Sequence, residues 1–251
     1  MSDIIIYIIV LIGGLIIGSF LNVVICRLPD IKSIIFTRSH CAKCKTKLSW
    51  YDMIPLFSFV ALEQKCRHCG KQISWQYPLV ELSTGLISIL IYYLYGWTSL
   101  TIFLWIISAL LIILFVYDVH WQLILDEILI PLLVVCIIYL LFFTSVDFVN
   151  KLYGAGIGMV VIALIYLITK GKGIGFADIK LMAPLGLILG WPKVMVALFF
   201  AFTVGALIGI CLVKFAKKGW KDPIAFGPFL IIGFYIALFW GDRILGWYFG
   251  L

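Results

Sequence analysis

Charged residues are scarce in this chain. They make up 12% of its 251 residues, about half the share that is typical of soluble domains. Hydrophobic residues make up 64%, and the mean hydropathy is +1.17. So little charge excludes a soluble globular enzyme, and an aromatic content of 16% excludes a disordered chain. Most of the chain is therefore expected to lie in lipid.

The first apolar run, residues 4–26, lacks the marks of a cleaved signal peptide. Only the acidic Asp3 precedes it, where a signal peptide carries basic residues. The run also contains no cleavage motif of the A-x-A type. We therefore expect a retained membrane span at residues 1–26.

The apolar stretches indicate an all-α integral membrane helical bundle of about eight hydrophobic segments. They cover residues 4–26, 79–95, 100–117, 128–143, 152–169, 179–190, 194–215 and 229–249. A span needs about 20 residues, so the segment at 179–190 is short and is expected to be tilted, extended or only partly crossing. The expected domains are the first span (1–26), a small polar domain (27–78) and a membrane core (79–251).

Basic residues predict the orientation of the spans. With the N-terminus outside, sixteen of the 19 Lys and Arg residues fall on cytoplasmic loops, the asymmetry expected of membrane proteins. The polar domain is then cytoplasmic, and both termini lie outside. This distribution also explains the formal net charge of +7 without a nucleic-acid partner.

Two CxxC pairs lie in the polar domain, with 21 residues between them. This spacing predicts a zinc site of four thiolates. Four protein ligands complete the coordination shell of the ion, so the metal is expected to be structural. Disulfides are the alternative, but a reducing cytoplasm disfavours them. His68 lies inside the second pair and is a less favoured ligand. The expected ligands are Cys41, Cys44, Cys66 and Cys69.

Two carboxylates lie next to apolar segments, and both fall at the cytoplasmic boundary in this topology. Asp118 ends the third segment, and Asp178 opens the sixth. Two neighbouring carboxylates can share a proton and divide general base and general acid work between them. From spacing alone, helix capping or an interfacial position remains open for each.

Several motifs appear in an order that resembles one known family. They are GSFLNVVICRLP at 18–29, the two CxxC pairs around IPLFSF at 54–59, YPLVELSTG at 77–85, GFAD at 175–178, Pro223 and FGP at 226–228. This order resembles the type IV prepilin peptidases, bifunctional leader peptidase and N-methyltransferase enzymes of pilus, type II secretion and competence systems. The resemblance covers nearly the whole chain.

The resemblance implies a membrane aspartyl protease of the GxGD type, with Asp118 and Asp178 at the two catalytic positions. It implies cleavage of prepilin or pseudopilin precursors at the cytoplasmic face of the bacterial inner membrane. The new N-terminus would then be methylated from S-adenosylmethionine. Two rival hypotheses remain. A proton-coupled transporter predicts charges deep within the spans, and a non-catalytic assembly factor predicts that the aspartate pair is dispensable.

This chain departs from the family pattern at two places. The second glycine of GxGD is Ala177, so we expect a negative φ there, with Gly173 or Gly175 shaping the turn. The segment after Asp118 reads Ile-Leu-Asp without the proline that relatives often have, and Asp126 is expected to start a helix. Lys180, with Asp126, is expected to support the site.

Three other features yield expectations about packing and binding. Asn22 lies inside the first span and needs a hydrogen-bond partner on another helix. Glu81 is a candidate ligand of S-adenosylmethionine. The alternative, that it is only a carboxylate at a helix start, is equally well supported. Gly154 and Gly158 have the spacing of close helix packing rather than of a nucleotide-binding loop.

Overall fold

The computed structural model describes residues 2–41, 43–143, 148–215 and 224–250. Across these ranges the chain is helical, and the β-structure is limited to two isolated bridges. The elements are α1 Ser2–Arg27, α2 Ile31–Phe36, the 3-10 helix η1 Trp50–Met53, α3 Phe57–Ala61, α4 Gln76–Tyr95, α5 Ser99–Trp121, α6 Asp126–Phe143, α7 Phe148–Thr169, α8 Phe176–Leu189, α9 Lys193–Phe215 and α10 Gly227–Phe249. The expected all-α class is confirmed.

The eight long helices among the described residues coincide with the eight apolar segments. Six of them are long and apolar enough to cross a membrane: α1, α4, α5, α7, α9 and α10. The two others are α6 and α8. Helix α8 has 14 residues and is about 21 Å long, which is shorter than a hydrocarbon core of about 30 Å. The segment expected to be short is therefore short.

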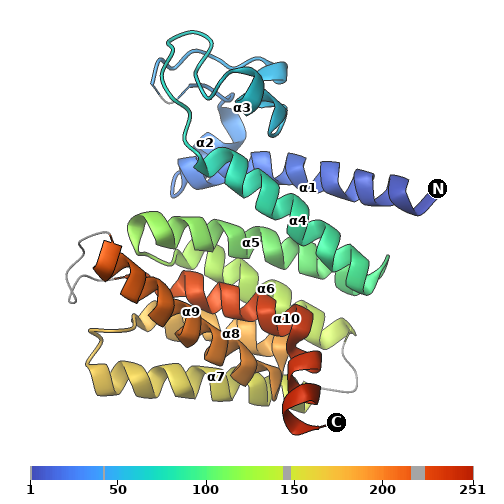
Figure 1. Ribbon diagram of the computed structural model, residues 1–251, viewed down its shortest axis with the longest axis vertical. Coiled ribbons are helices and arrows are strands. Elements are labelled where there is room, and N and C mark those ends of the chain that lie inside the picture. The colour runs from blue at the N-terminus through green and yellow to red at the C-terminus, as the bar shows by residue number, and fades with distance from the viewer. Residues whose placement is uncertain (1, 42, 144–147, 216–223, 251) are drawn as a thin grey trace. The chain divides into compact units, whose positions relative to one another are not determined.

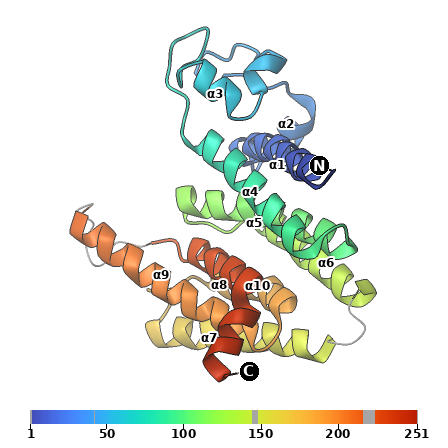
Figure 2. The ribbon, with the colours of Figure 1, turned by 45° about the vertical axis from the view of Figure 1, so that its right-hand side comes forward.

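The chain divides into two compact units, residues 1–113 and 114–251, with the boundary inside α5. In the first unit α1 packs along α4, and in the second unit α7, α8, α9 and α10 lie side by side in both views (Figure 1 and Figure 2).

Some residues of the sequence analysis lie outside the described residues. They are Pro223 of the last motif and three of the basic residues that predict the orientation, Lys217, Lys218 and Lys221.

Glycines bring α1 and α4 into close contact. A Cβ on Gly14 would lie 2.8 Å from the Cα of Gly85, and a Cβ on Gly18 would lie 2.7 Å from the Cα of Glu81. Gly14 and Gly18 are four residues apart, so both lie on the face of α1 that α4 covers. The sequence analysis missed this pair, although its spacing is the same as that of Gly154 and Gly158.

Asn22 links α1 to the first turn of α4. Its side-chain amide donates to the carbonyl oxygen of Tyr77 at 3.0 Å, and its Oδ1 accepts from Gln76 Nε2 at 3.4 Å. The residue is only 1% exposed, so an unpaired amide would be costly there. The expected hydrogen bond to another helix is confirmed.

In the second unit, α7 and α8 meet at glycines. A Cβ on Gly154 would lie 2.5 Å from the Cα of Gly190, and a Cβ on Gly186 would lie 2.5 Å from the Cα of Ala155. Gly158 faces the Met182 side chain in the same way. The expectation that this glycine run serves helix packing is confirmed, and the packing fixes α8, which carries Asp178.

Candidate functional site

The four cysteines of the two CxxC pairs come together in the first unit. All four Sγ atoms lie within 4.8 Å of one another. Cys41 Sγ and Cys69 Sγ are 4.0 Å apart, about twice the length of a disulfide bond. Four thiolates around a tetrahedral ion with bonds of about 2.3 Å would be roughly 3.8 Å apart. The cluster is therefore a candidate metal centre of the expected composition.

Each CxxC pair lies in its own backbone turn, and the two turns have the same hydrogen-bond pattern. The N–H of Cys41 donates to the carbonyl of Thr46 at 3.0 Å, and the N–H of Cys66 donates to that of Lys71 at 2.9 Å. The residue after the second cysteine has a positive φ in both turns, 57° at Lys45 and 65° at Gly70. The two turns are thus equivalent and aim their sulfurs at one point.

Local hydrogen bonds favour the thiolate form at two of the four cysteines, whereas burial and the neighbouring thiols together raise the pKa of the Cys69 thiol to about 11 despite the backbone N–H of Lys71. The hydroxyl and backbone N–H of Thr46 lower the pKa of the Cys44 thiol to about 6. Backbone N–H groups of Cys69 and His68 lower the pKa of the Cys66 thiol in the same way. A thiolate is the form that binds metal. His68 is exposed and lies outside the cluster.

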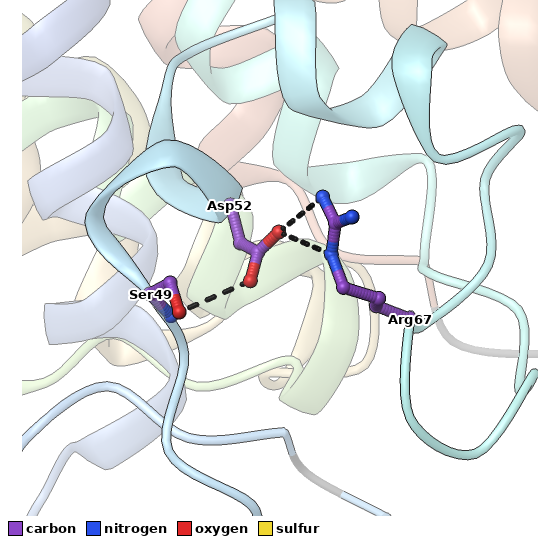
Figure 3. Close-up of polar contacts among 3 residues, drawn as sticks. All are labelled: Ser49, Asp52 and Arg67. Atoms are coloured by element: carbon purple, nitrogen blue, oxygen red, sulfur yellow. Dashed lines mark hydrogen bonds and ion pairs between the residues drawn. The ribbon is translucent and has the colours of Figure 1, made fainter.

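An ion pair joins the second cysteine turn to η1. Arg67 donates from Nε and Nη2 to Asp52 Oδ1 at 3.1 and 3.0 Å, and Asp52 Oδ2 accepts from the N–H of Ser49 (Figure 3). The Asp52 side chain is 3% exposed, so the pair is better shielded than an ordinary surface pair. It fixes the position of η1 relative to the metal centre.

Glu81 holds the loop before α3. Its Oε2 accepts from the backbone N–H of Leu56 at 2.8 Å, and the Ser19 hydroxyl also donates to the carboxylate. The side chain is 7% exposed and lies in the second turn of α4, not at the helix start. These contacts suit a carboxylate that anchors a loop, and the expected role of Glu81 toward S-adenosylmethionine stays a prediction.

Asp118 lies in the last turn of α5, in the second unit, and faces the start of α10. It is 5% exposed, and the backbone N–H of Gly227 donates to its carboxylate. A Cβ on Gly227 would lie 2.5 Å from Asp118 Oδ2, so a side chain at this position would displace the carboxylate. Gly227 is the first residue of α10, where free N–H groups and the helix dipole favour a negative charge.

Asp178 is the third residue of α8 and reaches back over the helix start. Its Oδ2 accepts from the N–H of Gly175 at 2.8 Å. Because the capping residue Gly175 has no side chain, Asp178 itself satisfies one of the N–H groups at this helix end. The residue is 5% exposed. The capping interpretation that the sequence left open therefore applies, and it holds the carboxylate in a fixed place.

The backbone before Asp178 has the geometry expected at Ala177. Ala177 is the second residue of α8 and is not among the residues with positive φ. Positive φ angles between α7 and α8 lie at Lys170 and Gly171, 50° and 72°. Gly173 lies in the bend that follows, and Gly175 has φ −80° and donates its N–H to Asp178. The role expected of Gly173 or Gly175 in shaping this segment stays a prediction.

The two aspartates come together in the second unit. Their carboxylates lie close enough for the charge on Asp118 to act on Asp178. Each one accepts a backbone N–H at the start of a helix, from Gly227 of α10 and from Gly175 before α8. Two buried carboxylates within electrostatic reach of each other do not readily ionise together.

Lys180 and Asp126 form an ion pair between α8 and α6. Lys180 Nζ lies 3.0 Å from both oxygens of Asp126. Asp126 opens α6, as expected, and Lys180 lies two residues after Asp178. The side chains are 41% and 56% exposed, so the pair contributes little to stability. It links the segment that follows Asp118 to the helix that carries Asp178.

Two family models match the chain. The model described as "Bacterial Peptidase A24 N-terminal domain" matches residues 12–95, and that of the "Type IV leader peptidase family" matches residues 105–210. A protein of Aeromonas salmonicida named "Prepilin leader peptidase/N-methyltransferase" is 35% identical, over 94% of this chain and 91% of its own. The chain belongs to the type IV leader peptidase family.

Other members of the family with the same name are similarly related. The protein of Bacillus subtilis is 36% identical over 96% of both chains. That of Pseudomonas aeruginosa is 33% identical over 92% of this chain and 89% of its own. No solved structure matches the chain. The resemblance stated from the motifs is confirmed, and with six apolar helices it indicates a multi-pass protein of the inner membrane.

Most of the site residues described above lie within the segments that the two family models match. The metal centre, Asn22 and Glu81 lie within the match of the N-terminal domain, and the two aspartates lie within that of the peptidase family. Gly227 lies beyond both matches and was missed as a partner of Asp118. The signal that could have found it is the FGP motif at 226–228, whose glycine starts a helix.

Proposed function

We propose that this chain is a membrane aspartyl endopeptidase that removes the leader of type IV prepilin-like precursors and methylates the new N-terminus. The observation that carries the proposal is the pair of buried, interacting carboxylates, Asp118 and Asp178, in the region matched by the family model. The names of the relatives support both activities.

In the proposed reaction the pair shares one proton. The ionised carboxylate takes a proton from a water molecule as the water attacks the scissile carbonyl carbon. The protonated carboxyl group donates its proton to the carbonyl oxygen, which gives a tetrahedral intermediate. As the C–N bond breaks, the carboxyl group that took the proton from water gives it to the leaving amine. The other carboxylate regains its proton from a hydroxyl of the intermediate, so that both groups return to their starting state. Gly227 and Gly175 keep the carboxylates oriented through their N–H groups.

The proposed substrates are prepilins or pseudopilins, which carry a short basic leader ending in glycine, followed by an apolar helix. The proposed orientation places the polar domain and the aspartates on the cytoplasmic side, because sixteen of the 19 basic residues then lie there. S-adenosylmethionine would supply the methyl group. Glu81 is the candidate for binding it; since its contacts to Leu56 and Ser19 are those of a loop anchor, we assign it no step in the reaction.

The test is incubation of the purified, lipid-reconstituted protein with a prepilin and S-adenosylmethionine, followed by mass spectrometry of the products. We expect loss of the leader peptide and gain of one methyl group on the mature chain. A chain that binds the prepilin without cutting it would contradict the proposal and would instead fit a non-catalytic assembly factor.

We further propose that the metal at the four cysteines is zinc and that it has a structural role. Four protein ligands leave no position for a metal-bound water. We expect one zinc per purified chain by atomic emission spectroscopy, and its loss together with a lower unfolding temperature in Cys66→Ser. Cleavage should persist in this variant at a reduced level, because the aspartates need no metal. The control is Cys211→Ser, an exposed cysteine outside the cluster. A Cys66→Ser chain with a full complement of zinc would contradict the assignment.

Ala177→Gly should change cleavage less than twofold. The alanine lies in α8 without positive φ, so a glycine there relieves no strain. The glycine would lower the stability of the helix by about 1 kcal/mol, because glycine has a lower helix propensity than alanine. Kinetics on a prepilin give the measurement. A rise of tenfold or more, about 1.4 kcal/mol in the barrier, would show that alanine strains the site.

A further inference from the structure

Six large hydrophobic side chains among the described residues of the polar domain are exposed, and four of them form two pairs with a spacing of three residues. Trp50 is 75% exposed, Met53 40%, Phe57 67% and Val60 74%. We call these four residues, from η1 and α3, the apolar ledge. A soluble surface normally scatters such side chains singly, so a run of four within eleven residues marks a contact surface.

Local structure explains why the two side chains of each short helix share a side. Positions i and i+3 eclipse each other in a 3-10 helix, and they are neighbours on an α-helix. Trp50 and Met53 are related in this way in η1, as are Phe57 and Val60 in α3. Phe59 points inward instead, is 7% exposed and contacts Trp75 with 5.0 Å between ring centroids.

The ledge is tied to a membrane helix. Leu56, which lies between the two short helices, donates its N–H to Glu81 of α4 at 2.8 Å. Helix α4 has 20 residues, which is about the minimum for a span, so its first residue lies at the membrane boundary. Glu81 is the sixth residue of this helix, about 8 Å further along it. The hydrogen bond therefore places Leu56 within about 10 Å of the level where lipid headgroups meet the acyl chains.

The charge around the ledge is positive. Residues 27–78 contain nine Lys and Arg residues and three Asp and Glu residues. Segments that lie in the interfacial layer of a membrane with anionic lipids typically combine Lys and Arg with Trp and Phe. In both views α2 and α3 lie on the same side of α1 (Figure 1 and Figure 2).

We propose that the apolar ledge inserts into the lipid headgroup layer, so that the metal-binding domain lies on the bilayer. Trp50, Met53, Phe57 and Val60 contact lipid, and the basic residues of the domain contact anionic headgroups. The ion pair of Asp52 with Arg67 (Figure 3) fixes η1 against the second cysteine turn, so insertion of the ledge also fixes the metal centre relative to the membrane. This inference is independent of the peptidase activity.

The test is photo-crosslinking of the full-length protein in nanodiscs of phosphatidylethanolamine and phosphatidylglycerol. The photoreactive p-benzoylphenylalanine replaces Phe57 in one sample and Gln72 in the control, since Gln72 is exposed on the same domain but polar. Intact-mass spectrometry detects the added mass of one phospholipid. We expect at least fivefold more lipid adduct at position 57 than at position 72, and a decrease when phosphatidylglycerol is replaced by a zwitterionic lipid.

Equal lipid adducts at the two positions, or none at position 57, would overturn the proposal. Adducts to an added prepilin, or to a second copy of the chain, in place of lipid would assign the ledge to that partner instead and equally overturn it. As a measurement without the photoreactive residue, lipids brominated near the headgroup should quench Trp50. The quenched fluorescence should then fall in Trp50→Phe, and an unchanged value would contradict insertion. Zinc content shows whether each variant is folded.

Discussion

Asp118→Asn and Asp178→Asn should each abolish prepilin cleavage, with a loss of roughly 10³-fold or more in kcat. Asparagine has the shape of aspartate and can still accept the N–H of Gly227 or Gly175, so the helices that meet at the site should keep their places. It cannot exchange a proton with water or with a leaving amine. Because the two carboxyl groups act as a unit, the double variant should be no slower than either single variant.

The matched control is Asp242→Asn. Asp242 lies on α10 and pairs with Lys193 at 2.7 Å, but its side chain is 80% exposed, so cleavage should be unchanged. Single-turnover kinetics with saturating prepilin measure the chemical step directly. Retention of more than a tenth of the wild-type rate in either active-site variant would show that the pair is not the catalytic one. Thermal unfolding shows whether each variant is folded.

Gly227→Ala should lower kcat about 100-fold while leaving the fold intact. The added Cβ would lie 2.5 Å from Asp118 Oδ2 and 3.3 Å from Ile124 Cδ1. The carboxylate would have to move by about 1 Å to reach normal contact, and a misplacement of this size can cost about 10²-fold in rate. The backbone N–H is still present in the variant, so the loss would come from position and not from a missing donor.

Two comparisons separate this effect from a general loss of packing. Gly156→Ala adds a Cβ that meets nothing within 4 Å and should leave cleavage unchanged. In Gly227→Ala the KM for prepilin should change less than threefold, since the substitution acts on a catalytic group and not on substrate binding. An activity within twofold of wild type would show that Asp118 needs no close approach by α10.

The membrane segments were predictable because apolar runs of this length have one stable solution. Backbone polar groups in lipid must be satisfied within the segment, which requires a helix. The apolar runs therefore correspond to helices within a few residues, for example 100–117 inside α5 Ser99–Trp121 and 194–215 inside α9 Lys193–Phe215. The helices extend beyond the runs because polar residues at their ends, such as Asp126 and Lys193, remain helical.

The four cysteines were predictable from spacing alone, because a CxxC turn brings two sulfurs to one point whatever surrounds it. The approach of Asp118 to Asp178 was not predictable from spacing in the same way, since the two residues lie 60 positions apart. Only the resemblance to a family selected them from the twelve acidic residues, and the packing of the second unit then brought them together.

By itself the sequence determined the helical class, the number of long helices, the four-cysteine cluster that could hold a metal and the family, because each depends on local composition or on short spacing. Only the tertiary structure decided that Gly227 contacts Asp118, that Lys180 pairs with Asp126 and that Glu81 holds Leu56. The physical reason is that these contacts join segments 25 to more than 100 residues apart. Their partners are fixed by how the helices pack, and the separation along the chain does not reveal which segments meet.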